Sequence, residues 1–376
     1  MSKLRVCHIT SSHGKEDVRI FLKECVSLSK KYDTTLVQLG DSYEKDGVKI
    51  VGFGKRPDSR LYRLLFAGRK AFKAALKVDA DVYHAHDPEL LKYCLKLKKK
   101  GKTVIFDSHE NYCDAVLNKR YIPSFMKKSV RNWFYRFQKK VCSAIDGVVV
   151  VTPDLLDFFK EINKNVVMVT NYPFYVELEG KPNYESKQLG FVGALDDDWS
   201  HSRIISALTK IPSSKYLLAG VGDQDYIDSL KKVNGWNQVT FLGKIPHSTV
   251  FDRLKECAVG MALLVPSFNT FWDRGTMGNT KIFEEMSVGL PIICTNFILW
   301  KEFVDKYKCG IYVDPYNEDE IYNAINSLLN NPKLCEELGN NAKLAVKNEF
   351  NWGHEEAKLY DFYDTILKEK EGTINQ

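Results

Sequence analysis

The feature of this sequence that most constrains its fold is an alternation of short, β-rich apolar runs with longer segments whose apolar residues recur at helical spacing. Strands and helices that alternate in this way form a parallel sheet covered by helices on both faces. The first half of the chain therefore predicts a doubly wound α/β domain. Its predicted strands are residues 6–10, 34–39, 49–52, 82–86, 103–108, 147–152 and 166–170.

The same alternation begins again after residues 174–187, a stretch with a glycine, a proline and few periodic apolar residues that we interpret as an interdomain linker. We expect residues 1–170 to form one Rossmann-like domain and residues 187–350 to form a second. Residues 351–376 contain a closing helix. The predicted strands of the second half are residues 188–192, 216–219, 239–242, 259–264 and 291–295.

The composition excludes several classes of protein. With 44% hydrophobic and 27% charged residues, the chain is typical of a soluble globular protein. Its nine cysteines are scattered and form no CxxC pair, which argues for a reducing compartment and against a disulfide framework or a structural zinc site of that kind. The amino terminus lacks the apolar core of a signal peptide, and no apolar run is long enough to span a bilayer. These features predict a cytoplasmic protein.

The stretch GNTKIFEEMSVGLPIICT, residues 278–295, predicts a short helix at residues 281–288 that is ended by a glycine and a proline. Lys281 would lie in the first turn of this helix, where the positive end of the helix dipole disfavours a cation unless an anion binds there too. The preceding loop supplies glycines, hydroxyl groups and free backbone N–H groups, so we expect it to hold a diphosphate. The loop residues expected to contribute are Arg274, Thr276, Gly278, Asn279 and Thr280.

One turn further along the same helix, Glu284 could accept hydrogen bonds from the hydroxyl groups of a ribose. An alternative that needs no ligand is that Lys281 pairs with Glu285, while Glu284 only complements the helix dipole. A lysine that precedes its glutamate forms the weaker of the two possible helical pairs, which favours the phosphate site.

Polar residues follow two predicted strands of the first half, at the carboxyl ends where parallel sheets bind ligands. His84 and His86 would share one face of a strand, as metal ligands can. A metal would need a third ligand, which the sequence does not indicate, so we predict no metal site. His109 follows the next strand and is the better candidate for contact with a substrate, the alternative being a histidine hydrogen-bonded in the core or loop. The loop after the first strand carries the single glycine Gly14, which excludes a GxGxxG dinucleotide fingerprint.

Basic residues interleaved with aromatic ones are concentrated in two segments of the first half, residues 55–73 and 119–140. Basic amphipathic helices with Trp, Phe and Leu on the other face bind anionic membrane surfaces. RNA binding is an alternative, but no RNP, KH or double-stranded RNA-binding pattern supports it. Ordinary packed helices with solvated basic faces are a second alternative. We predict contact with a membrane surface and no nucleic acid partner.

Several of these motifs resemble those of glycosyltransferases with the two-domain B-type fold (GT-B), in particular family 4 and its bacterial surface-polysaccharide relatives. The segment NTKIFEEMSVGLP is similar to the family signature PxKxxEyMaxGxP, and HAHDPEL, FDSHEN and ITSSHGKEDVRIFLKEC resemble motifs of the acceptor-binding domain. FVGALDDDWSHSRI, LLAGVGD and VTFLGKIPHSTV resemble donor-domain segments, and FNWGHEEAKLYDFYDTIL resembles the closing helix that returns to the first domain. The resemblance implies two Rossmann-like domains that face each other across a cleft.

The resemblance also implies roles for individual residues. Glu284 would hold the ribose of a sugar-nucleotide donor, Lys281 would contact its diphosphate, and His109 would lie near the transferred sugar. Gly14 would face the diphosphate from the first domain. The further donor-binding positions are Gly193, Gly243, Lys244 and Ile245, the last three through backbone contacts with the base.

The sequence departs from the family pattern at two points. Thr276 occupies a position where the family often has a second glutamate, and apolar and acidic residues follow Gly193, where many members carry an arginine and a lysine. The charge of the diphosphate would therefore be carried by Lys281, by Arg274 or Arg203, and by backbone dipoles.

For the activity, the resemblance implies transfer of a hexose from a UDP- or GDP-linked donor to a glycan, lipid-linked and of the O-antigen or capsule type, by a peripheral protein at the inner face of the cytoplasmic membrane. It implies retention of anomeric configuration, with no protein nucleophile, no metal and no other cofactor. Two alternatives stay open. One is a nucleotide-sugar epimerase of the same fold, which would need an acid/base set that the sequence does not locate. The other is a non-catalytic protein that binds sugar nucleotides or membranes.

Overall fold

The computed structural model describes residues 3–55, 66–118, 122–267 and 270–374. The chain divides into two compact units, one formed by Met1–Asn171 with His354–Gln376 and the other by Tyr172–Gly353. Residues 56–65 and 119–121, which belong to the two predicted basic segments, lie outside the described residues.

The first unit is built on an eight-stranded sheet with the order β3-β4-β2-β1-β5-β6-β7-β8. Neighbouring strands are parallel except for β3 and β4, which pair antiparallel at one edge. The strands are β1 (Arg5–Ile9), β2 (Asp33–Gln38), β3 (Tyr43–Lys45), β4 (Val48–Gly52), β5 (Val82–Ala85), β6 (Thr103–Ser108), β7 (Gly147–Val150) and β8 (Val166–Met168).

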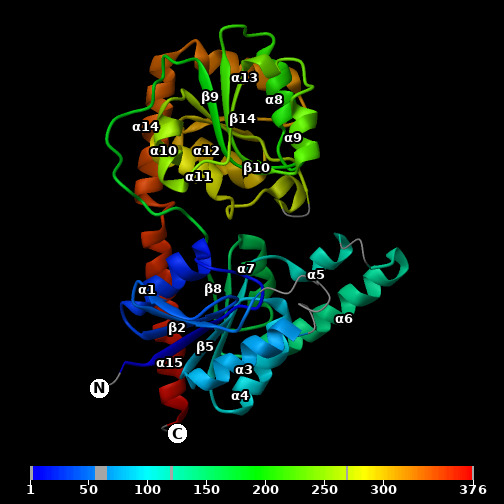
Figure 1. Cartoon of the computed structure of the whole chain (residues 1–376), viewed down its shortest axis with the longest axis vertical. Helices are drawn as coiled ribbons and strands as arrows, with labels where there is room; N and C mark the ends of the chain where they lie inside the picture. Colours follow the sequence, from blue (N-terminus) through cyan, green and yellow to red (C-terminus); the bar gives the residue numbers. More distant parts are fainter. Residues whose placement is uncertain (1–2, 56–65, 119–121, 268–269, 375–376) are drawn as a thin grey trace. The chain divides into compact units, whose positions relative to one another are not determined.

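Helices cover both faces of this sheet, as alternate residues of β5 show. Tyr83 points to one face, where its hydroxyl donates to the carbonyl of Ala75 on α3. His84 points to the other face, where its Nδ1 lies 2.9 Å from the hydroxyl of Tyr363. Tyr363 belongs to the closing helix α15, which is labelled in Figure 1. The helices of this unit are the π-helix η1 (Val18–Cys25), α1 (Val26–Ser29), α3 (Gly68–Val78), α4 (Leu91–Lys99), α5 (Tyr112–Ala115), α6 (Ser124–Cys142), α7 (Pro153–Lys160) and α15 (Trp352–Ile374).

The second unit has a six-stranded parallel sheet with the order β11-β10-β9-β12-β13-β14 (Figure 1). Its strands are β9 (Gln188–Leu195), β10 (Lys215–Gly222), β11 (Val239–Gly243), β12 (Val259–Ala262), β13 (Ile292–Thr295) and β14 (Gly310–Val313). Its helices are α8 (His201–Leu208), α9 (Gln224–Leu230), α10 (Val250–Lys255), α11 (Thr280–Val288), α12 (Ile298–Tyr307), α13 (Glu318–Leu329) and α14 (Pro332–Asn348). Short 3₁₀ turns at Trp236–Gln238, His247–Thr249 and Trp272–Arg274 connect some of these elements.

The two doubly wound α/β sheets confirm the predicted fold class, because each strand predicted from an apolar run is present in a described sheet. The structure adds β3, β14 and the helices α12, α13 and α14, which the sequence analysis did not locate. Residues 174–187, interpreted as a linker, instead belong to the second unit. The hydroxyl of Tyr184 donates to the carbonyl of Gly289 at 2.8 Å, and the backbone N–H of Asn183 donates to Lys255. Among the described helices, none is long and apolar enough to cross a bilayer.

Candidate active site

The helix predicted to bind a diphosphate is present in the second unit as α11, with the predicted glycine at its end and, at its start, an asparagine cap that the sequence analysis did not assign. At the start, the side chain of Asn279 accepts a hydrogen bond of 3.0 Å from the backbone N–H of Lys281. At the end, Gly289 takes the left-handed conformation with φ of 95°, which a glycine adopts at little cost. The amino end of α11 follows the carboxyl end of β12, so it lies at the edge of the sheet where such folds bind ligands.

Lys281 and Glu284 form an ion pair on the first turn of α11. Lys281 Nζ lies 2.9 Å from Glu284 Oε2, and the two side chains are 29% and 11% exposed. Burial would raise the pKa of Glu284, but His247 and Lys281 outweigh it and hold this pKa below its ordinary value. The alternative pairing of Lys281 with Glu285 is wrong. Lys281 pairs with Glu284 instead, and the carboxylate of Glu285 is buried.

Gly193 at the end of β9 is brought against the side chain of Lys281. A Cβ on residue 193 would lie 3.3 Å from Lys281 Cδ and 2.8 Å from the ring of Phe191. Because Gly193 has no side chain, the space that a Cβ would need stays available to the side chain of Lys281.

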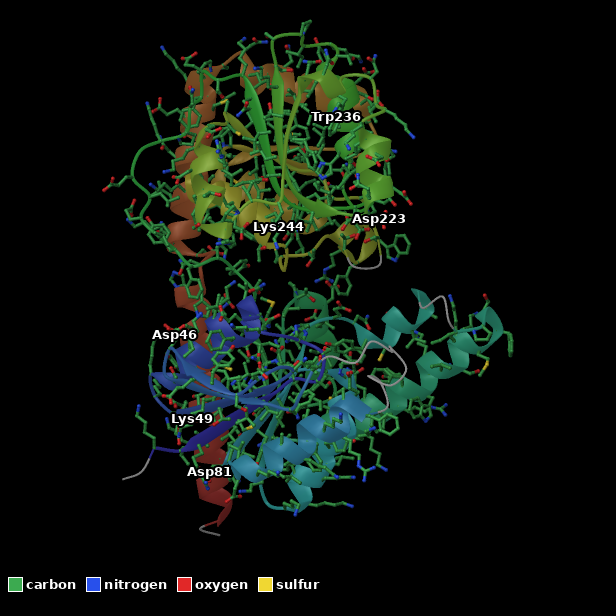
Figure 2. The ribbon with its side chains drawn as sticks, viewed as in Figure 1. Asp46, Lys49, Asp81, Asp223, Trp236 and Lys244 are labelled. Carbon is green, nitrogen blue, oxygen red and sulfur yellow. The ribbon has the colours of Figure 1, made fainter. Side chains whose placement is uncertain are left out.

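The loop after β11 also reaches α11. It starts at Gly243, which has a φ of 62°, and continues through Lys244 and Ile245 into a 3₁₀ turn at His247–Thr249. Figure 2 shows Lys244 and Asp223 at one end of the second unit and Trp236 at the opposite end. Both labelled loop residues follow the carboxyl ends of their strands, so the predicted base-binding loop lies at the ligand-binding edge of the sheet.

His247 is a site residue that the sequence analysis missed. Its Nε2 lies 3.8 Å from Glu284 Oε1, on the other side of the carboxylate from Lys281. The motif VTFLGKIPHSTV contains this histidine, but only the backbone of the motif was given a role. An imidazole beside the expected ribose-binding carboxylate is placed to orient it.

Internal hydrogen bonds hold the loop before α11. Thr276 accepts the backbone N–H of Gly278 through its hydroxyl at 3.1 Å, and its carbonyl accepts Trp300 Nε1–H at 2.8 Å. Arg274 ends the 3₁₀ turn at Trp272–Arg274. Thr276, at the position of the family's second glutamate, therefore has a structural role in the described loop.

Charges beyond Lys281 are less favourable to a diphosphate. The guanidinium of Arg203, considered for that role, lies 4.9 Å over the ring of Tyr316. Asp198, in the acidic run after β9, has its pKa raised by burial and by the neighbouring Asp196 and Asp197. Of Lys281 and Arg203, Lys281 is therefore the cation that lies at the amino end of α11.

In the first unit, the loop after β1 is fixed by one buried carboxylate. Asp87 Oδ2 accepts hydrogen bonds from the hydroxyl of Thr10 at 2.8 Å and the backbone N–H of Ser11 at 2.6 Å, and Asp87 Oδ1 accepts the hydroxyl of Ser12. Burial would raise the pKa of Asp87, but these donors and His13 hold it below its usual range. Gly14 follows in the same loop, and a Cβ there would meet no atom within 4 Å.

His109 lies at the carboxyl end of β6, against Asp107 and His86. Its Nε2 is 3.1 Å from Asp107 Oδ2 and 3.2 Å from His86 Nδ1, and its side chain is 15% exposed. Burial would raise the pKa of Asp107, but the charge of Arg19 and the neighbouring histidines keep it well below its ordinary value. An ionised Asp107 accepts the Nε2 proton of His109, which leaves Nδ1 of His109 to accept a proton from a hydroxyl group.

His13 is a second residue that the sequence analysis passed over. Its ring packs edge-on against that of His109 at 5.6 Å, and its Nδ1 lies 2.9 Å from Asp17 Oδ2. The hydrogen bond to Asp17 raises the pKa of His13 by more than burial lowers it. A partly exposed imidazole with a raised pKa beside His109 can carry positive charge toward an anionic substrate.

Two family models match the chain, one on each unit. The model described as "Glycosyltransferase Family 4" matches residues 25–171, and the model described as "Glycosyl transferases group 1" matches residues 179–345. They contain His109 and the Lys281–Glu284 pair, respectively.

Similar proteins agree with these matches. The capsular polysaccharide biosynthesis glycosyltransferase CapM of Staphylococcus aureus is 31% identical over 189 residues, covering 49% of this chain and 47% of CapM. The chain thus matches less than half the length of the curated relatives. Sucrose-phosphate synthase from Thermosynechococcus elongatus has the same fold with a TM-score of 0.74 and 17% identity, covering 97% of this chain and 100% of that one. HepE of Anabaena, solved with UDP and glucose, has a TM-score of 0.71 and 15% identity, covering 96% and 100%.

Proposed function

We propose that this chain, a member of the GT-B glycosyltransferases that resemble family 4, transfers a hexose from a nucleoside diphosphate sugar to a glycan acceptor with retention of configuration. The observation that carries the proposal is the Lys281–Glu284 pair on the first turn of α11, with Gly193 and the loop after β11 beside it. A cation, a carboxylate and a helix amino end at one point suit the diphosphate and ribose of a sugar nucleotide.

The donor half of the reaction follows from charge. Breaking the bond between the anomeric carbon and the phosphate oxygen leaves negative charge on the diphosphate and positive charge on the sugar. The amino end of α11 and Lys281 would stabilise the departing diphosphate. Glu284, kept ionised by Lys281 and His247, would accept the hydroxyl protons of the ribose. We favour a UDP-linked donor, because HepE was solved with UDP and with UDP-glucose.

The sugar and acceptor would be handled by the first unit. His109 has its Nε2 directed to Asp107, so its Nδ1 is the atom available to a sugar hydroxyl. The acceptor hydroxyl would attack from the side on which the diphosphate leaves, and its proton would pass to that diphosphate. No protein nucleophile is then needed.

A lipid-linked acceptor is part of the proposal because of the surface of α6. Phe125 and Trp133 on this helix are 84% and 64% exposed. Of its residues, only Gln138, Val141 and Cys142 near its end are buried. Its exposed basic residues are Lys128, Arg136, Lys139 and Lys140. Exposed aromatic and basic side chains on one helix suit an anionic membrane surface, where lipid-linked intermediates of surface polysaccharides are assembled.

The first prediction tests donor binding and turnover. We expect UDP-sugars, and UDP itself, to raise the thermal unfolding temperature of the purified chain more than uridine does, because the diphosphate supplies the contacts at α11. Differential scanning fluorimetry with UDP- and GDP-linked hexoses would identify the donor. Assays for donor hydrolysis and transfer would follow. A donor that binds tightly but is neither hydrolysed nor transferred, with extracted lipid-linked glycans as acceptors, would favour the non-catalytic alternative.

The second prediction tests membrane contact. We expect the chain to sediment with vesicles containing phosphatidylserine at low salt and to be released as salt rises. Trp133→Ser should weaken binding about tenfold, since it removes an exposed aromatic anchor. Trp272, also 64% exposed but in the second unit, offers the matched control Trp272→Ser. Equal loss in both variants, or no sedimentation of the wild type, would contradict a membrane role for α6.

A further inference from the structure

Four side chains of metal-ligand type converge in the interior of the first unit, away from solvent. They are His8 on β1, Glu24 on η1, His84 on β5 and His86 just after it, and each is fully buried. One ligand atom from each lies within 4.8 Å of the others. The sheet register explains the convergence, because His8 is the pairing partner of His84 and His86 lies two residues further along the same face.

We propose that this cluster holds a divalent transition-metal ion of the Zn²⁺ type, bound by His8 Nδ1, His84 Nε2, His86 Nε2 and an oxygen of Glu24. The sequence alone offered only the two histidines of the HAH motif. The fold supplies the missing ligands from β1 and η1.

The distances suit such an ion. His8 Nδ1 and His86 Nε2 are 2.8 Å apart, at hydrogen-bond distance, and each lies 3.9 Å from Glu24 Oε2. An ion bound among these atoms would replace the hydrogen bond between the two imidazoles. The point equidistant from these three atoms lies about 2.1 Å from each, which is the length of a zinc–nitrogen or zinc–oxygen bond. Three imidazole nitrogens and one carboxylate oxygen form a donor set that zinc prefers.

The remaining polar atom of each ligand already has a partner of the kind that orients metal ligands. His86 Nδ1 lies 3.4 Å from Asp107 Oδ2, and Glu24 Oε1 lies 3.1 Å from Arg19 Nη2. The hydroxyl of Tyr363 lies 2.9 Å from His84 Nδ1 and 3.5 Å from His8 Nε2. Such outer partners fix the ring orientation and the tautomer, so that the other nitrogen is free to bind a metal.

Without an ion, the cluster leaves polar groups unsatisfied. Among the described residues, His84 Nε2 and Glu24 Oε2 are buried and make no hydrogen bond, and Glu24 Oε1 has only its ion-pair contact with Arg19. Glu24 and Asp107 also share the guanidinium of Arg19, whose Nη2 lies 3.1 Å from Glu24 Oε1 and 2.9 Å from Asp107 Oδ2. A bound cation would give Glu24 Oε2 and His84 Nε2 a partner. Its positive charge would also balance the charge of the two carboxylates, Glu24 and Asp107, that share one arginine.

The proposed ion would be structural rather than catalytic. All four ligands are sealed from solvent, so no substrate reaches the ion directly. It would tie together β1, η1 and β5, and through Tyr363 it would fix α15 to the sheet. The ion would take no part in the transfer step itself, although its ligand His86 lies 3.2 Å from His109 through Nδ1.

The third prediction is the metal content of the protein. We expect the full chain, expressed without a polyhistidine tag and purified without chelators, to carry about one zinc ion per chain by plasma mass spectrometry. Protein grown with Co²⁺ in place of Zn²⁺ should show the intense visible bands of a four-coordinate cobalt site. Glu24→Gln and His84→Gln should lose the metal and the cobalt bands.

His201 provides the matched control. It is buried in the second unit with its Nδ1 2.9 Å from the hydroxyl of Tyr216, as His84 lies against Tyr363, but the described residues offer it no neighbouring metal ligands. His201→Gln should keep the metal. Tyr363→Phe, which preserves packing, should weaken zinc affinity by about 10- to 100-fold. Wild-type protein that stays metal-free after dialysis against Zn²⁺ would overturn the proposal. So would zinc retained equally in His84→Gln and His201→Gln, which would show an adventitious ion only.

Discussion

Replacing Lys281 with alanine is expected to lower kcat/KM for the sugar-nucleotide donor by about 10²- to 10³-fold, which corresponds to about 2.7–4 kcal/mol of transition-state stabilisation. Lys281 lies at the amino end of α11, and in the proposed reaction its Nζ meets charge that develops on the leaving diphosphate. Steady-state kinetics with the identified donor would measure the effect. Lys232→Ala, at an exposed lysine of the same unit, is the control and should leave kcat/KM unchanged.

The same variant can separate loss of a phosphate contact from loss of the ion pair with Glu284. A phosphate contact predicts that Lys281→Ala weakens binding of the nucleoside diphosphate strongly and binding of the nucleoside weakly. Disruption of Glu284 and the ribose site predicts equal weakening of both. Isothermal calorimetry with UDP and uridine distinguishes these outcomes, and wild-type turnover in a folded Lys281→Ala variant would refute the assignment.

The parts of the fold that the sequence predicted are those governed by local chemistry. Buried parallel strands are continuous apolar runs, so β1, β5, β6 and β13 could be recognised from the sequence. The end of helix α11 was marked by the left-handed glycine Gly289, whose role is local, whereas the cap formed by Asn279 was recognised only in the structure.

The elements that escaped prediction depend on tertiary contacts. The strand β3 has only three residues and pairs with β4 at an edge, where little apolar periodicity is required. Residues 174–187 contain few regular apolar positions, yet the hydroxyl of Tyr184 is fixed by the carbonyl of Gly289, far away in the sequence. No local pattern reports such a contact.

The candidate site likewise combines features set by local sequence with features set by tertiary contacts. Lys281 and Glu284 are three residues apart, so their proximity follows from helical spacing, but the same spacing also allowed the pair with Glu285 that the structure does not form. By contrast, His247 reaches Glu284 and His13 reaches His109 only because loops from different strands end at the same edge of a sheet. The buried cluster is the extreme case, since the register that places His8 beside His84 becomes visible only once the sheet is known.

Glu285 should make the stability of the second unit depend on pH in a direction opposite to that of an ion-paired glutamate. It lies on α11 directly after Glu284, faces β12, and is 1% exposed. A Cβ on residue 260 of β12 would lie only 2.6 Å from Glu285 Oε2, which shows that β12 packs directly against the carboxyl group. Neither oxygen makes a hydrogen bond of normal geometry, although the backbone of Met261 is a polar neighbour. Burial, followed by the charge of Glu284, raises the pKa of Glu285 well above its ordinary value of 4.5.

The sign of the effect follows from proton binding. Below pH 4.5, both the folded and the unfolded chain carry a protonated Glu285, and the residue contributes no pH dependence. Above that pH the unfolded chain loses the proton while the folded chain keeps it, so this residue destabilises the fold increasingly as pH rises, until the folded-state pKa is reached.

Glu285→Gln removes the ionisation and keeps the shape of the side chain. The free energy of unfolding of the variant should therefore exceed that of the wild type by up to about 1.4 kcal/mol for each pH unit above 4.5, until the folded-state pKa is reached. Denaturant unfolding of both proteins between pH 5 and pH 8 measures the gain, with Glu302→Gln on the exposed face of α12 as the control. A stability difference that stays constant across this range would show that Glu285 is ionised in the folded protein and has a partner.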